Sequence, residues 1–209
     1  ARDLAFPQVP SHWRHIPHPK RMDLQAKPPE LAVKPRLRVL GVGRLVPLKQ
    51  FDVLVRACVR LSHTLPIELH ILGEGHHQPL LDLAVNTPLA EHFQLRVSTQ
   101  IAEEMHQADV YVSTSSTESF GLANLEALCS GLPMVCTAVG GVPEVLGDAA
   151  WLVPLDEHVI EAALHTMLCN PQVRQQWATR AQQRAQFWPT PSQVTHLYHS
   201  LYSHVAQTV

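Results

Sequence analysis

The stretch from Ser115 to Leu128 concentrates the side chains best suited to bind a phosphorylated ligand. It begins as a small polar turn and continues as a predicted helix from about Gly121. The free N–H groups and positive dipole of a helix N-terminus favour a diphosphate. Glu118 precedes this helix, and Glu126 lies about 12 Å further along at 1.5 Å per helical residue. Two acceptors so placed could hold opposite ends of an extended ligand, one on sugar hydroxyls and one on ribose hydroxyls.

An ordinary structural role is the alternative for this stretch. Ser119 would then cap the helix, Glu118 would complement its dipole, and Glu126 would be a solvated surface residue. Glu126, however, lies inside an apolar run from Leu122 to Leu128, where an unpaired carboxylate is costly. The sequence therefore favours a binding role for the two glutamates.

A second segment, beginning at Gly41, offers cations. Its glycines, Gly41 and Gly43, allow a backbone to approach a ligand, and Arg44 and Lys49 can both reach a phosphate. Taken alone, the segment fits a flexible turn with two solvated cations better than a binding site. A dinucleotide-binding fingerprint needs glycine at the position of Val46, so hydride-transfer chemistry is disfavoured.

Two further glycine-rich segments have more than one interpretation. Gly73-Glu74-Gly75 fits a plain tight turn better than the wall of a pocket. Gly140-Gly141 precedes a helix started by Pro143. It fits equally well a turn that admits a ligand closely and a loop that needs positive φ.

The elements that must position these segments alternate regularly. From Leu37 onward, short apolar runs alternate with longer amphipathic stretches, as in β-α-β units. The predicted fold class is therefore α/β, a Rossmann-like parallel sheet covered by helices on both faces. Ligands bind such a sheet at the carboxyl ends of its strands, where all four segments fall. Strands are predicted at Leu37 to Val42, Ile67 to Leu72, Gln94 to Val97, Val110 to Ser113, Met134 to Thr137 and Ala150 to Val153.

Helices are predicted between the strands and in an α-rich C-terminal tail. The first, Phe51 to His63, carries an apolar stripe at the 3-4 spacing. The remaining predicted helices are one carrying Leu80, Leu81, Leu83 and Ala84, and then Val159 to Leu168, Val173 to Phe187 and about Ser192 to Val205.

Composition narrows the class of protein. The 209 residues, 45% of them hydrophobic, suit one large domain. With 16 basic and 18 acidic residues, the net charge of -2 gives no footprint for nucleic acid. No apolar run reaches the roughly 20 residues of a membrane-spanning helix, and the beginning of the chain lacks a signal-peptide pattern. We expect a soluble protein.

Cysteine and histidine usage indicates neither disulfides nor a metal site. The 14 histidines do not repeat a metal-ligand spacing, so no metal is expected. The cysteines lie in apolar segments without Cys-x-x-Cys spacing, which predicts reduced, buried thiols of a cytosolic protein at Cys58, Cys129, Cys136 and Cys169.

The chain divides near residue 35. Residues 1–35 are rich in proline, which predicts an extended lead-in, an interdomain linker, before a domain at 36–209. Because the chain does not begin with Met, we expect it to be a piece of a longer protein.

Taken together, these motifs resemble the C-terminal domain of family 4 retaining glycosyltransferases with the GT-B fold. The resemblance runs from about Ile16 to the end of the chain, and the glutamate pair with seven residues between is its most specific mark. The motifs that match in order and spacing are Gly43-Arg44 with Lys49, Gly73-Glu74-Gly75, Glu118-Ser119-Phe120-Gly121-Leu122 with Glu126-Ala127, Gly131-Leu132-Pro133 and Gly140-Gly141-Val142-Pro143-Glu144.

The resemblance implies a role for each site residue. Arg44 and Lys49 would bind the diphosphate of a nucleotide-sugar donor and stabilise the leaving group without a metal or other cofactor. Glu118 would contact the transferred sugar, and Glu126 would hold the ribose. The remaining donor contacts would come from Gly43, Phe120, Gly121 and Leu122.

The resemblance also implies a reaction. A hexosyl group would pass from a UDP-sugar or GDP-sugar, with retention at the anomeric carbon, in polysaccharide or glycoconjugate biosynthesis. The acceptor, a carbohydrate, a lipid or a small molecule, would bind an N-terminal domain absent from this chain, so this half alone would be nearly inactive. The protein would be cytoplasmic. The missing domain would bring it to the inner face of the membrane.

Two positions depart from the family pattern. Gln50 stands where the family usually has glycine after the lysine. The stretch from Leu95 to Ile101 is short and lacks the usual glycine near the nucleobase. Two other functions compete: a non-catalytic nucleotide-sugar-binding module, which would not require a sugar-directed carboxylate, and an epimerase of related fold, which would need further acid and base groups.

Overall fold

Six parallel strands form the centre of the molecule. The computed structural model describes residues 16–21, 26 and 34–208. The strand order is β3-β2-β1-β4-β5-β6, and each neighbouring pair is parallel. This confirms the predicted fold class. The strands are β1 (Leu37–Val42), β2 (Ile67–Leu72), β3 (Phe93–Arg96), β4 (Val110–Ser113), β5 (Met134–Thr137) and β6 (Trp151–Val153).

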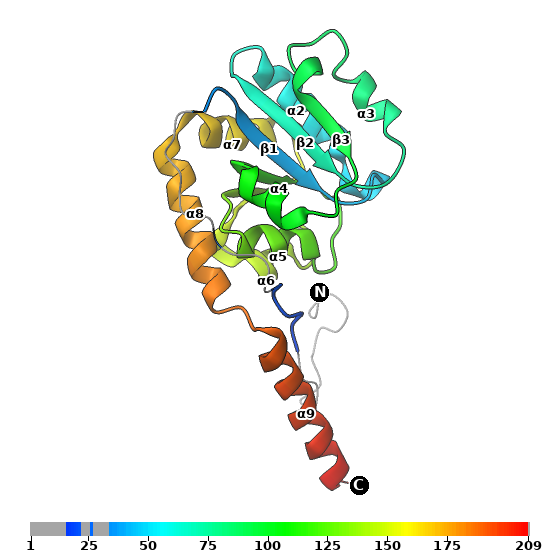
Figure 1. Ribbon diagram of the computed structural model, residues 1–209, viewed down its shortest axis with the longest axis vertical. Coiled ribbons are helices and arrows are strands. Elements are labelled where there is room, and N and C mark those ends of the chain that lie inside the picture. The colour runs from blue at the N-terminus through cyan, green and yellow to red at the C-terminus, as the bar shows by residue number, and fades with distance from the viewer. Residues whose placement is uncertain (1–15, 22–25, 27–33, 209) are drawn as a thin grey trace.

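Helices cover both faces of the sheet (Figure 1). One face packs against α2 (Phe51–Ser62) and α7 (Glu157–Cys169) around an apolar cluster that includes Leu54 and Leu164. The other packs against α4 (Ile101–Gln107), α5 (Leu122–Cys129), α6 (Val142–Leu146) and α8 (Pro171–Gln186). Because β4 and β5 are covered on both sides, all of their residues are buried.

Charged side chains join α2 to α7 at the edge of the first cluster. Glu157 accepts hydrogen bonds from Arg56 at 2.8 Å and from Arg60 at 2.5 Å. Burial opposes the charge of Glu157, but the two arginines outweigh it and lower the pKa of this carboxyl. Arg60 also bonds Glu161 at 2.6 Å. These pairs bridge the two helices beside the apolar contacts between them.

Some predicted elements needed correction. The helix α3 (Gln78–Asp82) ends before Leu83 and Ala84, which the sequence placed inside it. Ala84 is nevertheless buried, so the apolar pattern encoded burial in a turn and not helical periodicity. The prediction of buried thiols is also wrong for Cys169, which is exposed near the end of α7, whereas the other three cysteines are buried and all four are free.

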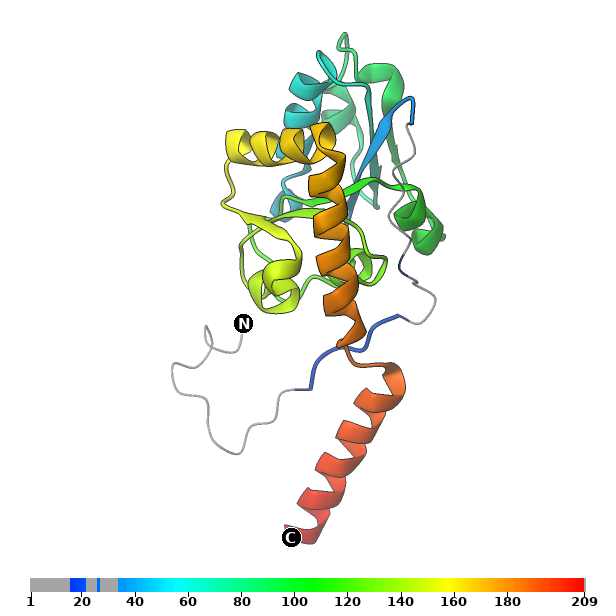
Figure 2. The same ribbon diagram turned by 90° about the vertical axis from the view of Figure 1, so that its left-hand side faces the viewer.

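The chain leaves the body of the domain at its C-terminal end. After α8, helix α9 (Pro191–Thr208) extends away from the sheet (Figures 1 and 2). Of the described helices, none combines the length and apolar content that a membrane crossing requires. Most of the predicted lead-in, residues 1–15, 22–25 and 27–33, lies outside the described residues. Its residues 16–21 run beside the end of α8 (Figure 2).

The strand order reverses between β1 and β4, and open parallel sheets have their ligand-binding crevice at such a point. The chain adds strands on one side of β1 as far as β3 and then crosses to the other side with β4. The helices that follow β1 and β4, α2 and α5, lie on opposite faces of the sheet, and the two loops before them meet at neighbouring strand ends, which is where open parallel sheets bind ligands. These two loops carry the first and the third of the segments singled out in the sequence.

Candidate functional site

The loops after β1 and β4 are tied together by hydrogen bonds. The hydroxyl of Thr114, just beyond β4, donates to the carbonyl oxygens of Lys49 and Gln50, both at 2.9 Å. The backbone N–H of Ser116 donates to the carbonyl of Leu48 at 2.8 Å. A single 3₁₀ turn, Pro47–Lys49, presents the lysine between these bonds. The position of Lys49 is therefore set by both sides of the crevice.

The backbone at Gln50 shows how the loop accommodates a residue that departs from the family pattern. It is left-handed, with φ 48° and ψ 40°, between the 3₁₀ turn and α2. Glycine adopts this conformation freely, whereas a residue with a Cβ pays a steric cost. The side-chain amide of Gln50 donates to the carbonyl of Pro47 at 3.0 Å and ties the turn to itself. The lysine loop thus keeps the glycine-like backbone without a glycine.

Lys49 and Glu118 face each other across the crevice. The Nζ atom of Lys49 lies 2.5 Å from Oε2 of Glu118, and their side chains are 24% and 16% exposed. The structure therefore brings together two residues that the sequence had placed in separate segments. A cation and a carboxylate in this position can turn to opposite parts of one ligand, the first to phosphate and the second to hydroxyl groups.

The N-terminus of α5 lies directly after Glu118. The N-cap residue is Gly121, with φ 83°, and no side chain caps the helix. Ser119 is exposed and is not the cap, so the structural alternative is wrong in its assignment of Ser119. The first N–H groups of the helix thus remain available to an anion.

Two buried residues hold that first turn in place. The hydroxyl of Tyr111, in β4, donates to Oδ1 of Asn124 at 2.9 Å. Burial raises the pKa of Tyr111 well above its ordinary value, so the phenol remains a donor. A Cβ on Gly121 would come within 2.6 Å of the Asn124 amide nitrogen. Glycine is therefore required for its φ and for the space. No local sequence pattern marks Tyr111 or Asn124 as part of the site, because the two residues are 13 positions apart in different elements.

Gly140 and Gly141 pack against the backbone of Glu118 and Ser119. A Cβ on Gly140 would lie 2.0 Å from the carbonyl oxygen of Glu118, and one on Gly141 would lie 2.2 Å from that of Ser119. The N–H of Gly141 donates to the Glu118 carbonyl at 2.9 Å. Of the two interpretations that the sequence left open, close packing of a loop with positive φ describes these contacts.

Arg44 lines a hollow of about 180 Å³ at the carboxyl ends of β1 to β3. The same hollow is lined by Gly43, Gly73 and Ser98. A Cβ on Gly73 would lie 1.8 Å from the carbonyl oxygen of Gly43, so this segment is a turn that packs on its neighbour and also forms a wall of the hollow. Arg44 is exposed and pairs with no carboxylate among the described residues.

The described lead-in residues contact two of the candidate site residues. Nη1 of Arg21 lies 2.9 Å from Oε1 of Glu126. The ring of His18 packs edge-on against the ring of Phe120, with 4.6 Å between the ring centroids. The ring centroid of Trp188 lies 6.1 Å from that of Phe120. Arg21 and His18 could not be predicted as neighbours of the site, because no local pattern links residues about a hundred positions apart.

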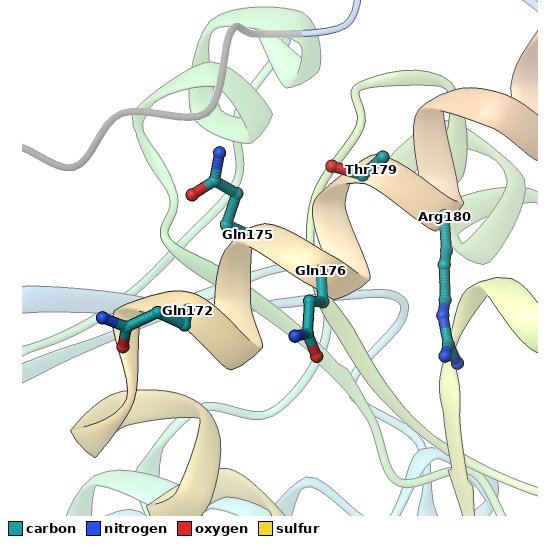
Figure 3. Close-up of a pocket in the computed structure, with 5 residues that line it drawn as sticks. All are labelled: Gln172, Gln175, Gln176, Thr179 and Arg180. Carbon is teal, nitrogen blue, oxygen red and sulfur yellow. The ribbon is translucent and has the colours of Figure 1, made fainter.

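A larger hollow lies elsewhere and does not compete for this role. Figure 3 shows five side chains of α8 that line a space of about 460 Å³, among them Gln172, Gln176 and Arg180. They come from a single helix and point in different directions, not towards one centre. None comes from a loop at the carboxyl end of a strand. We therefore place the candidate site at the crevice beside α5.

Known proteins share both the sequence pattern and the fold. The family model of glycosyl transferases group 1 matches residues 24–184. A D-inositol 3-phosphate glycosyltransferase of Kineococcus radiotolerans is 34% identical over 175 residues, covering 71% of this chain and 40% of that protein. The chain spans about two fifths of the length of such curated relatives.

Solved structures agree on the fold. WaaG, a glycosyltransferase involved in lipopolysaccharide biosynthesis, superposes with a TM-score of 0.78 at 20% identity, over 93% of this chain and 58% of its own. The C-terminal domain of the group 1 protein LpcC from Francisella tularensis gives a TM-score of 0.65 at 20% identity, over 73% of this chain and 86% of its own. This chain therefore belongs to the glycosyl transferases group 1 family and has the fold of its C-terminal domain.

Proposed function

We propose that this domain binds the nucleotide-sugar donor of a retaining glycosyltransferase in the crevice between the loops after β1 and β4. The observation that carries the proposal is the pairing of Lys49 with Glu118 beside the uncapped start of α5. The relatives named above are glycosyltransferases, which favours transfer over epimerisation or purely regulatory binding.

The diphosphate would lie between Lys49, Arg44 and the first N–H groups of α5. Lys49 would exchange Glu118 for a phosphate oxygen, and Arg44 would close the other side. Two side-chain cations and a helix N-terminus worth roughly half a charge match the charge of a diphosphate leaving group. This balance supports a metal-independent reaction, in which fixed positive groups stabilise the charge that develops on the leaving group.

The carboxylates would hold the two sugars of the donor. Once released from Lys49, Glu118 would accept hydrogen bonds from hydroxyl groups of the transferred hexose. Phe120, Gly121 and Leu122 would line the passage from hexose to phosphate, and Glu126, further along α5, would accept from the ribose. Bond cleavage at the anomeric carbon would pass through an oxocarbenium-like state, and transfer would retain the configuration there.

The nucleobase would enter the hollow beside Gly43. The short segment after β3 forms its far wall, where Ser98 donates to Glu104 at 3.3 Å and Arg96 pairs with Glu104 at 2.7 Å. These bonds tie the wall to α4 and give it a defined shape. Uracil and guanine are the two candidate bases.

The acceptor would bind a second, N-terminal domain of the whole protein, joined through a linker at residues 1–35. We place the reaction in the cytoplasm, with the missing domain at the inner face of the membrane, in the synthesis of a polysaccharide or glycoconjugate. The free state of all four cysteines supports a reducing compartment. Without the acceptor domain, this half would bind donor but transfer almost nothing.

Calorimetric titration tests the proposal. UDP, GDP, UDP-glucose and GDP-mannose are titrated into the domain and its Lys49→Ala variant. A lost charge-assisted hydrogen bond is worth about 1.5 to 3 kcal/mol, so the matching nucleotide should bind Lys49→Ala roughly 10- to 150-fold more weakly.

Arg180→Ala supplies the control for that titration. Arg180 is an exposed cation that stacks on Trp177 at 4.7 Å, away from the strand ends. It should bind nucleotide like the parent protein. Equal affinities for the Lys49 and Arg180 variants, or no nucleotide binding by the parent, would contradict the proposed site.

A further inference from the structure

We propose that Arg21 is a positioning residue of the donor site, which orients the carboxylate of Glu126 towards the ribose of the nucleotide. The inference rests on the proposed function. It adds to the site a residue from the lead-in segment (residues 16–21), which lies about a hundred positions before Glu126 in the sequence.

The contact itself suits a positioning role. Nη1 of Arg21 donates to Oε1 of Glu126 at 2.9 Å, and the side chains are 43% and 20% exposed. An ionised carboxylate has about four acceptor positions. A guanidinium that occupies one of them fixes the plane of the carboxylate and leaves others for hydroxyl groups. The ribose can therefore bind while the ion pair stays intact.

The lead-in segment holds Arg21 in place through the end of α8. The backbone N–H of Lys20 donates to the carbonyl of Pro189 at 2.9 Å, and its Nζ donates to the carbonyl of Ala185 at 3.2 Å. The indole N–H of Trp188 donates to the carbonyl of His18 at 2.8 Å. Arg21 follows directly after these anchors, so its backbone is held beside the end of α8. Figure 2 shows the segment beside the end of α8.

The same segment reaches the other end of the site. The ring of His18 packs on Phe120, just before the start of α5. Within α5, Glu126 lies one turn after Leu122, which is 57% exposed, so both residues belong to the open side of the helix. Neighbouring positions such as Leu125 and Ala127 are buried. The lead-in segment therefore lies along the side of α5 that the donor would contact.

Glu126 needs such support for a physical reason. A glutamate side chain loses rotamer entropy when it is fixed. If Arg21 fixes the Glu126 side chain before the nucleotide arrives, nucleotide binding no longer loses that rotamer entropy. The carboxylate then meets the ribose hydroxyls in one geometry. Without Arg21, Glu126 should still contact the ribose but distinguish it poorly from deoxyribose.

The experiment measures ribose discrimination. Dissociation constants for UDP and 2′-deoxy-UDP, or for the guanine pair if the domain selects guanine, are determined by calorimetry for the parent protein, Arg21→Ala, Arg21→Lys, Glu126→Ala and the control Arg180→Ala. The ratio of the two constants on one protein cancels any loss of folded material. A merely structural role of Arg21 would weaken both ligands equally and leave the ratio unchanged.

We expect a ratio above ten for the parent protein and for Arg180→Ala. It should fall to near one in Glu126→Ala and by about three- to tenfold in Arg21→Ala, with partial recovery in Arg21→Lys, which restores a donor.

An unchanged ratio in Arg21→Ala would overturn the inference. So would tighter binding of both nucleotides by that variant, because Arg21 would then mask Glu126. An unchanged ratio in Glu126→Ala removes the ribose contact and the inference with it, while the Lys49 result still stands for the proposed function. A parent protein that binds neither nucleotide refutes both.

Discussion

Replacing Gly140 by alanine tests how the loop after β5 holds Glu118. The new Cβ would lie 2.0 Å from the Glu118 carbonyl oxygen, and ordinary carbon contacts need about 3.5 Å, so one of the two loops must shift by roughly 1.5 Å. Gly140 also has a φ of 53°, and an alanine there costs roughly 1–2 kcal/mol.

The shift should also break a hydrogen bond. The bond from the Gly141 N–H to the Glu118 carbonyl is worth about 1 kcal/mol. Alanine recovers about 0.4–1 kcal/mol by restricting the unfolded chain. The net loss of stability should therefore be about 2 kcal/mol, which lowers Tm by roughly 4–8 °C for a domain of this size.

Donor binding separates this effect from simple destabilisation. Because Glu118 moves, Gly140→Ala should bind the matching nucleotide sugar at least about fivefold more weakly, a change of about 1 kcal/mol. Gly147→Ala is the control: its φ is also 53°, but its Cβ would meet the flexible end of Arg184 at 2.7 Å. It should lose stability and keep parental affinity. Parental affinity in both variants, measured by calorimetry below their melting temperatures, would refute the coupling between Gly140 and Glu118.

Three further predictions concern stability and reactivity. Gln50→Gly removes a non-glycine residue from positive φ, so urea unfolding should show stability unchanged or raised by up to about 1 kcal/mol; a clear loss would mean that the amide bond to the turn dominates. The lowered pKa of Glu157 makes its contribution present above the ordinary value of about 4.3 and lost as pH falls through the folded value. The stability gap between the parent and Glu157→Gln should therefore close below about pH 4, and a gap independent of pH would contradict the ion-pair assignment. Burial raises the pKa of the thiols of Cys58, Cys129 and Cys136, whereas Cys169 is exposed. Ellman's reagent should therefore detect one rapidly reacting thiol, which Cys169→Ser removes. Several rapidly reacting thiols would show a more open core.

Local sequence pattern was enough for most of the fold. The apolar runs at Leu37–Val42 and Ile67–Leu72 are bounded by turn residues, so both strands have the predicted bounds. The strand β3 begins and ends one position earlier than predicted, and β6 begins one position later, because pairing with the neighbouring strand, and not composition, decides where a ladder begins. The short helix α3 shows the limit of periodicity: an apolar side chain can be buried by a turn as well as by a helix.

The site was predictable in parts but not as an arrangement. The sequence identified Lys49 and Glu118 as a cation and an acid at strand ends. That these two ends are neighbours follows from the crossover between β1 and β4, which no local pattern encodes. The equal choice at Gly140 was likewise settled only by the carbonyl of Glu118 packed against it. The unusual residue at position 50 was visible in the sequence, whereas its left-handed backbone was visible only in the tertiary structure.

What the sequence determined by itself was the fold class, the approximate strands and the charged and glycine residues at the strand ends, because these depend on hydrophobic period and on chemistry carried within a few residues. Only the tertiary structure decided which of those residues meet. The contact of Arg21 with Glu126 spans 105 positions and depends on the segment anchored to α8. Contacts at such separation result from packing of the whole domain and leave no mark on the residues that lie between them.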